Sequence, residues 1–205
     1  MPRRTYPRPD YQHSQTASKV LARHAIKFGV QVDLPVPIEM IIERTYGLEI
    51  LWDNIPAVPG EIILGALAPG DRQIVLNLRH ESLFDRYIGP ERFTLAHELA
   101  HWIYDADDPD QLAFDFPEKP EKVYCLPPES PELTESQRIR EVNANKLAAH
   151  LLLPEDLVRC EVAAGALNDF SGTASRWKVS RSMLEIRLEE LGLIGKQEPT
   201  ESPPN

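Results

Sequence analysis

The stretch that decides the fold reads RFTLAHELAHW and spans residues 92–102. Within it, His97 and His101 form the ends of an H-E-x-x-H pattern. On an α-helix, residues four apart are separated by roughly 40° around the axis, so both imidazoles leave the same face. Two imidazoles in this arrangement can bind one Zn²⁺, and Glu98 can lean over the same face beside the metal without binding it.

The residues around the motif favour a helix. Pro90 suits the first turn. Apolar residues then recur at steps of three and four, which is the period of one helical face: Phe93, Ala96, Leu99, Ala100 and Ile103. The same five-residue pattern also occurs in helices whose histidines are ordinary surface groups, so a zinc site needs a further ligand from elsewhere in the chain.

A glutamate on a later helix is the best candidate for that third ligand. The metzincin continuation, with a glycine and a third histidine after His101, is absent. Residues 140–154 have a helical pattern in which Glu141 and Asn145 share one stripe. Glu141 can therefore complete a His₂Glu site while Asn145 orients a histidine from behind. His150 lies about 180° round the same helix and is not expected to bind the metal.

The two segments resemble the ImmA/IrrE family of metallopeptidases. The resemblance is carried by RFTLAHELAHW and by the later E-x-x-A-N-x-x-A-A-x-L-L-L-P, and it extends over about residues 17–194. It implies a zinc protease that cleaves a DNA-bound transcriptional repressor and so releases mobile-element or stress-response genes. It also implies that His97, His101 and Glu141 are the metal ligands and that Glu98 is the catalytic carboxylate. The long acidic spacer before Glu141 departs from the family pattern.

Composition limits the class of protein. The chain has 205 residues, of which 42% are hydrophobic, enough for one globular domain with a core. Its net charge of −10 argues against a general nucleic-acid binder. Cys125 and Cys160 are too few for a disulfide framework and fit a reducing compartment. Neither a signal peptide nor an apolar run of roughly 18 residues is present, so we expect a cytoplasmic protein without a membrane partner.

The predicted fold class is α+β, with a small antiparallel or mixed sheet flanked by helices. Helices are expected from Ser14 to Gly29 and from Pro37 to Tyr46. Strands are expected over residues 48–52, 61–68 and 73–78. The resemblance adds a gluzincin-like cleft between the H-E-x-x-H helix and the glutamate helix.

The chain divides into four parts. Residues 14–170 are expected to form the metallopeptidase domain, and residues 171–195 a separate C-terminal segment. Residues 1–13 and 196–205 are expected to be disordered tails. Inside the domain, the spacer 105–136 holds ten acidic residues against two lysines, and its six prolines exclude a regular helix through most of it. This spacer is either a solvated surface loop or a docking surface for a basic partner such as a DNA-binding repressor.

Residues 171–195 look like a helix-turn-helix. In DNA binders, the second helix of this motif carries base-reading and phosphate-binding side chains. Here it carries Arg181 and Arg187 against three glutamates, a poor balance for DNA. We therefore expect a packing unit or a protein-docking face, and no direct binding of nucleic acid.

Two further sets of site residues are proposed from their positions. The strand before the motif helix can bind an extended peptide if it forms the sheet edge that faces the cleft; otherwise it is an ordinary internal strand: Ile74, Val75, Leu76 and Asn77. A developing oxyanion needs a donor besides the metal, and the sequence does not choose among four candidates: Tyr104, Tyr124, His80 and Arg92.

The predicted function is a zinc-dependent metallopeptidase with one Zn²⁺ per chain, for which Mn²⁺ is a substitute, and a helix-turn-helix repressor as substrate. The alternatives are a non-catalytic regulatory binding module and the toxin or immunity component of a two-protein system. A purely structural zinc site usually has four protein ligands and is rich in cysteine. Three ligands of the His₂Glu type with an intact Glu98 favour catalysis.

Overall fold

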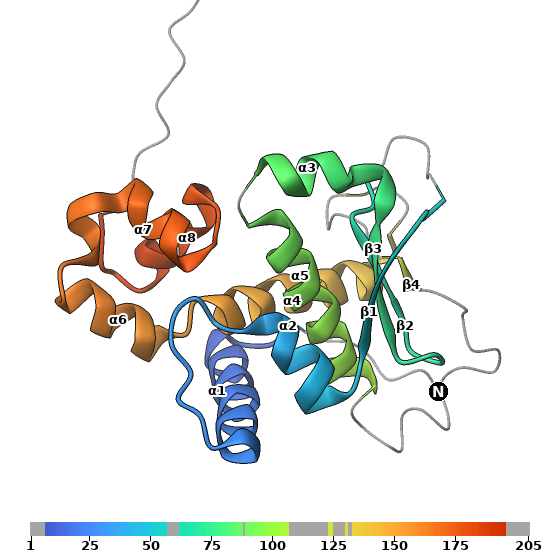
Figure 1. The fold of residues 1–205 in the computed structure, drawn as a ribbon, viewed down its shortest axis with the longest axis horizontal. Helices are drawn as coiled ribbons and strands as arrows, with labels where there is room; N and C mark the ends of the chain where they lie inside the picture. The colour runs from blue at the N-terminus through green and yellow to red at the C-terminus, as the bar shows by residue number, and fades with distance from the viewer. Residues whose placement is uncertain are drawn as a thin grey trace, which may run out of the picture.

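The computed structural model describes residues 7–56, 62–87, 89–106, 123–124, 130 and 133–195. The fold is α+β, as the sequence predicts, with the sheet at one end, α6–α8 at the other and α4 and α5 between them (Figure 1). The helices are α1 (Asp10–Phe28), α2 (Ile38–Met40), α3 (Glu81–Arg86), α4 (Pro90–His101), α5 (Glu135–Leu152), α6 (Glu155–Ala163), α7 (Phe170–Trp177) and α8 (Arg181–Glu190). Shorter helical turns are η1 (Ile41–Tyr46), η2 (Leu78–His80), η3 (Trp102–Ala106) and η4 (Ala166–Asp169).

The sheet is small and mixed. Its strands are β1 (Glu49–Asp53), β2 (Gly65–Ala68), β3 (Gln73–Asn77) and the two-residue β4 (Val123–Tyr124), in the order β1-β3-β2-β4. β1 and β3 run parallel, with Leu51 opposite Val75, whereas β2 is antiparallel to both β3 and β4.

The predicted edge role of Ile74, Val75, Leu76 and Asn77 is therefore wrong. These residues lie in β3, which has β1 on one side and β2 on the other. Both rows of backbone hydrogen-bonding groups of β3 are used within the sheet, so β3 has no free edge on which a peptide can pair. The internal-strand alternative is the one that the structure has.

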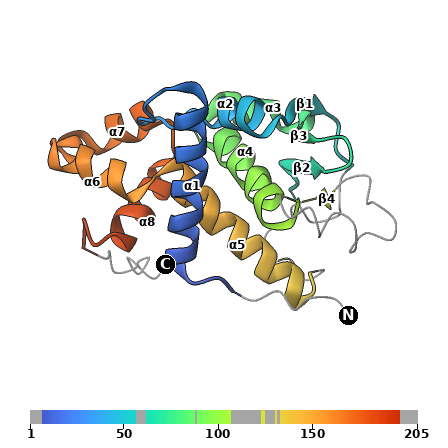
Figure 2. The same cartoon turned by 90° about the horizontal axis from the view of Figure 1, so that it is seen from below.

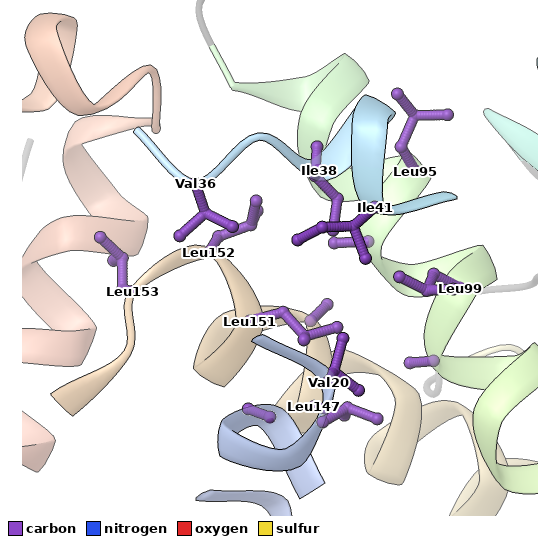
Figure 3. Close-up of a cluster of buried hydrophobic side chains, with 14 of the residues drawn as sticks. Val20, Val36, Ile38, Ile41, Leu95, Leu99, Leu147, Leu151, Leu152 and Leu153 are labelled. Carbon is purple, nitrogen blue, oxygen red and sulfur yellow. The ribbon is translucent and has the colours of Figure 1, made fainter. Parts of the chain in front are cut away.

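Helices α4 and α5 form the centre of the molecule and lie against each other (Figure 2). All residues of α4 from Thr94 to His101 are buried, as expected for a helix covered on every side. Small side chains at the contact let helix axes approach closely, and four buried alanines stand on these two helices: Ala96, Ala100, Ala144 and Ala148. Larger apolar side chains from α1, α2, η1, α4 and α5 fill the surrounding core (Figure 3): Val20, Ile38, Ile41, Leu95, Leu99, Leu147 and Leu151. Among the described residues, no helix combines the length and the apolar character that a bilayer crossing requires.

Helix α1 begins earlier than the sequence predicts. It starts at Asp10, inside the predicted tail 1–13, and it ends as predicted before Gly29, which has φ 64°. His13 is fully buried in this first part. Its Nε2–H donates to the Arg8 carbonyl at 3.2 Å, and its Nδ1 accepts from the Tyr104 hydroxyl at 2.8 Å. Because both nitrogens of the neutral imidazole have hydrogen-bond partners, this polar side chain can be buried in the core.

The buried His13 should make stability depend on pH. Burial lowers the pKa of its imidazole to about 4 from the ordinary value of 6.5. Between these two values the unfolded chain binds more protons than the folded chain, so the free energy of unfolding falls as the pH is lowered from 6.5 to 4. We expect the Tm of the wild type to fall more steeply over this range than the Tm of His13→Gln, measured by circular dichroism. Parallel curves for the two proteins would contradict the assignment.

The C-terminal helices pack onto the centre of the molecule through the turn between α7 and α8. Gly89 precedes α4 with φ 106°, and a Cβ at this position would lie 2.6 Å from the Ser180 nitrogen. Arg187 of α8 is almost fully buried, donates to the Leu153 carbonyl and to His150 Nδ1, and pairs with Glu190. One of the two arginines of the supposed recognition helix therefore anchors α8 and cannot contact DNA.

Loss of the Arg187 anchor should destabilise the fold. Arg187→Ala would leave the buried Leu153 carbonyl and His150 without their partner, and we expect the free energy of unfolding to fall by about 3 kcal/mol. The matched control is Arg159→Ala, which removes an exposed ion pair to Glu155 and an exposed hydrogen bond to the Leu191 carbonyl. It should change the free energy of unfolding by about 0–1 kcal/mol. Urea unfolding compares the variants, and equal effects would contradict the anchoring role.

Candidate metal centre

The predicted metal ligands converge in the interior of the protein. Helix α4 places His97 and His101 on one face, with 3.1 Å between their Nε2 atoms. Helix α5 brings Glu141 against them, so that its Oε2 lies 3.0 Å from His97 Nε2 and 3.4 Å from His101 Nε2. One ligand atom from each of the three residues lies within 4.8 Å of the others. This buried group could hold a metal ion between two nitrogens and a carboxylate oxygen, the donor set of a catalytic zinc site.

Asn145 fixes the orientation of the first histidine. It stands one helical turn after Glu141 on α5, and its Oδ1 lies 2.8 Å from His97 Nδ1. An amide oxygen only accepts hydrogen bonds, so His97 Nδ1 carries a proton. His97 Nε2, which faces Glu141, is then the nitrogen that can bind a metal once it has lost its own proton. The Phe93 ring, one turn earlier on α4, lies beside the same imidazole with 6.4 Å between the ring centroids. The orienting role predicted for Asn145 therefore agrees with the geometry.

Glu141 is held in its ionised form. Burial acts to raise its pKa, but hydrogen bonds from His101 and His97, and their positive charge, outweigh this effect and lower the pKa to about 2. A carboxylate must be deprotonated to bind a metal. The Glu141 carboxyl therefore meets this requirement at neutral pH.

Glu98 is fully buried on α4, next to the strand β2. The first residue of β2 is Gly65, where an added Cβ would lie 2.5 Å from Thr94 Cγ2 and 3.1 Å from Glu98 Oε1. Only a glycine permits the strand to approach the helix this closely. Gly65 is a functional position that no motif reveals, since an isolated glycine inside a predicted strand indicates a close approach without identifying its partner.

Two of the four predicted oxyanion donors form hydrogen bonds with other groups of the protein. The Tyr104 hydroxyl is bonded to His13 on α1. Arg92 binds the Glu39 carboxylate at 2.9 and 3.1 Å and also donates to the Val36 carbonyl, so it ties α4 to α2. Residue type and proximity in sequence predict a role for both side chains at the site. In the structure, each instead forms hydrogen bonds with a residue of a neighbouring helix.

Of the other two candidates, only His80 has a described side chain. His80 ends the turn η2, and no hydrogen bond connects it to the metal ligands within the described part of the chain. Tyr124 lies in β4 opposite Ala66, and its side chain is outside the description. Also outside the described residues are Cys125, most of the spacer 105–136 and the tail 196–205. His150 contacts other groups: its Nε2 lies 3.1 Å from Asp10 Oδ1 and its Nδ1 lies 3.0 Å from an Arg187 nitrogen.

The Asn145 contact leads to a prediction about metal affinity. Asn145→Ala removes the acceptor for His97 Nδ1–H, and loss of such a supporting contact typically weakens metal binding by about 10–100-fold. We expect this loss in a competition titration against a zinc-binding dye. Asn143→Ala is a poor control because Asn143 is itself buried, so the exposed Lys146→Ala on the same helix is the better one. Equal zinc affinities for Asn145→Ala and the wild type would contradict the supporting role.

Comparisons with known proteins leave the family open. No family model matches the chain, and no curated protein matches it. Among solved structures, a similar chain is a Mycobacterium tuberculosis transcriptional regulator, with a TM-score of 0.48 and 15% sequence identity. The match covers 88% of this chain and 46% of that chain, so this chain spans about half the length of its structural neighbour. A likeness this distant carries no argument about function, and the resemblance to the ImmA/IrrE family stays a prediction based on two motifs.

Proposed function

We propose that this protein is a zinc metallopeptidase that cuts a DNA-binding transcriptional repressor. The observation that carries the proposal is the convergence of His97, His101 and Glu141 in one buried cluster, with Glu98 buried on the same helix. Three of these four residues come from the H-E-x-x-H motif, and Glu141 comes from a helix more than thirty residues later.

The residues have separate roles in the proposed reaction. A zinc ion bound by His97, His101 and Glu141 would polarise the scissile carbonyl and make water a stronger acid. Glu98 takes the proton from the attacking water and passes it to the leaving amine. The helix α4 fixes both functions relative to each other, because the base directly follows the first ligand in sequence.

The number of ligands supports catalysis over a purely structural role. Structural zinc sites usually have four protein ligands, whereas catalytic sites keep one position open for water or substrate. Within the part of the chain that the structure describes, three residues make up the cluster. This observation favours a peptidase over a non-catalytic regulatory module.

The choice of substrate rests on the family resemblance and on charge. The resemblance implies a repressor as substrate, and repressors have basic DNA-binding faces. A chain with a net charge of −10 is complementary to such a face, and complementary charge speeds the encounter of two proteins.

The test is incubation of the zinc-loaded protein with a helix-turn-helix repressor from the same genome, taken from a neighbouring gene where one is encoded there, and separately with unfolded casein. We expect cleavage of the repressor at one or few positions, no comparable loss of casein, and no cleavage after a chelator has removed the zinc. Rapid degradation of casein without preference for the repressor would contradict the proposal and indicate a general peptidase.

A further inference from the structure

A chain of four polar side chains joins helix α8 to α5 and α1. Its central members are His150 of α5 and Arg187 of α8, which are both buried. Arg187 Nη2 lies 3.0 Å from His150 Nδ1, and Asp10 Oδ1 of α1 lies 3.1 Å from His150 Nε2. At the other end, Arg187 Nη1 lies 3.1 Å from the Glu190 carboxylate. The imidazole of His150 therefore connects the C-terminal helix to the centre of the molecule.

These contacts require a neutral His150. A guanidinium only donates hydrogen bonds and keeps its charge, so His150 Nδ1 must accept from Arg187 with its lone pair. The single proton of the ring then lies on Nε2, which donates to Asp10. A second proton, on Nδ1, would place two donors and two positive charges 3.0 Å apart. The contact between His150 and Arg187 must therefore break when His150 is protonated.

The groups around His150 favour the neutral imidazole in this closed arrangement. Burial and the charge of Arg187 lower the pKa of His150 below its ordinary value of 6.5, against the opposing effects of Asp10 and Glu190. The His13 ring stacks on it, with 6.1 Å between the centroids and 28° between the planes, and has a pKa of about 4. The charged and titratable groups near His150 come from α1, α5 and α8: Asp10, His13, Lys146, Arg187 and Glu190.

We propose that His150 is a pH-sensitive switch, whose protonation releases Arg187 and lets α8 separate from α5. Leu184 and Leu188 of α8 are buried in the main core cluster, so their burial keeps α8 in place while His150 is neutral. Separation of α8 exposes these two leucines. The switch goes beyond the proposed function and does not depend on it, because none of the three metal ligands takes part.

The direction of the pH effect follows from the two forms. With α8 open, His150 is exposed and has its ordinary pKa of 6.5, whereas with α8 closed its pKa is lower. Below pH 6.5 the open form therefore binds more protons than the closed form, so acid favours opening. One proton changes this equilibrium by at most about ten-fold per pH unit. Between about pH 7.0 and pH 5.5, the opening constant of α8 should rise about four- to eight-fold.

The experiment measures amide hydrogen exchange of the full-length protein by mass spectrometry at these two pH values. Exchange rates are divided by the intrinsic rate at each pH, which gives the opening constant of each segment. We expect the four- to eight-fold rise in the amides of α8. At both pH values these amides should also open more often than those of the internal strand β3, which distinguishes local opening from unfolding of the whole protein.

The key variant is His150→Asn. The asparagine Oδ1 stands the same number of bonds from the backbone as His150 Nδ1 and can accept from Arg187, but it does not take up a proton over this pH range. The opening constant of α8 should then change less than about two-fold with pH. His24→Asn is the matched control, because His24 is also buried but is bonded to Thr45 at 2.7 Å. It should keep the wild-type rise.

Three results would overturn the switch. They are a wild-type rise of less than about two-fold, the full rise in His150→Asn, and equal opening constants for α8 and β3. The variant His13→Gln separates His150 from the histidine stacked on it and should keep the rise. A rise that is lost in His13→Gln would assign the pH effect to His13 and would also contradict the role of His150.

Discussion

Replacing Glu98 with glutamine is expected to slow repressor cleavage by about 10²–10⁴-fold while the zinc content stays at one ion per chain. Glutamine has nearly the shape of glutamate, so the buried site next to β2 keeps its packing. The amide cannot take a proton from water, so the general base is lost. The three metal ligands are unchanged, and the effect should therefore fall on kcat more than on metal binding.

The measurement combines single-turnover cleavage with elemental analysis of the same preparation. Glu91→Gln is the matched control, because Glu91 lies in the first turn of the same helix α4 and outside the metal cluster. It should cleave at close to the wild-type rate. Cleavage by Glu98→Gln at a rate comparable to that of the wild type would remove Glu98 from the mechanism.

Replacing Glu141 with alanine is expected to remove most of the bound zinc, and cleavage with it. Glu141 is the anionic member of the cluster and the proposed third ligand, and its Oε2 contacts both histidines. Removal of a supporting residue alone weakens metal binding by about 10–100-fold, so removal of a ligand should exceed that range. Glu141→Gln keeps the volume but not the charge, and it should also bind zinc weakly.

Elemental analysis after dialysis decides between these outcomes. Glu135→Ala is the matched control, since this glutamate lies in the first turn of the same helix α5 and its side chain is 81% exposed. It should retain one zinc per chain. If Glu141→Ala also retained one equivalent, the third ligand would have to come from another part of the chain.

Local patterns in the sequence predicted the elements that build the candidate site. The period of the apolar residues placed the helix α4, and the shared stripe of Glu141 and Asn145 placed both side chains on one face of α5. The helices predicted from Ser14 to Gly29 and from Pro37 to Tyr46 end at Gly29 and Gly47, and both glycines adopt the left-handed conformation. These features depend on neighbours within one or two helical turns, which is the range in which a single sequence is informative.

Contacts between segments that lie far apart in the chain could not be predicted from the sequence. The strand β3 precedes α4 in the chain, but its place inside the sheet depends on the parallel partner β1, more than twenty residues earlier. The donors of Arg92 and Tyr104 are used by α2 and α1, which no local pattern reveals. The polar composition of residues 1–13 predicts a disordered tail that includes His13. No residue near His13 in sequence indicates that the Tyr104 hydroxyl forms a hydrogen bond with its ring.

The most direct test of the account is a crystal structure of the zinc-loaded protein with anomalous data collected at the zinc absorption edge. The account predicts a single strong peak bound by His97 Nε2, His101 Nε2 and one oxygen of Glu141, at about 2.0–2.2 Å from each. The fourth position should hold no protein ligand and should lie within reach of Glu98. A fourth protein ligand on the ion would indicate a structural site, and a peak elsewhere in the molecule would contradict the assignment of the metal centre.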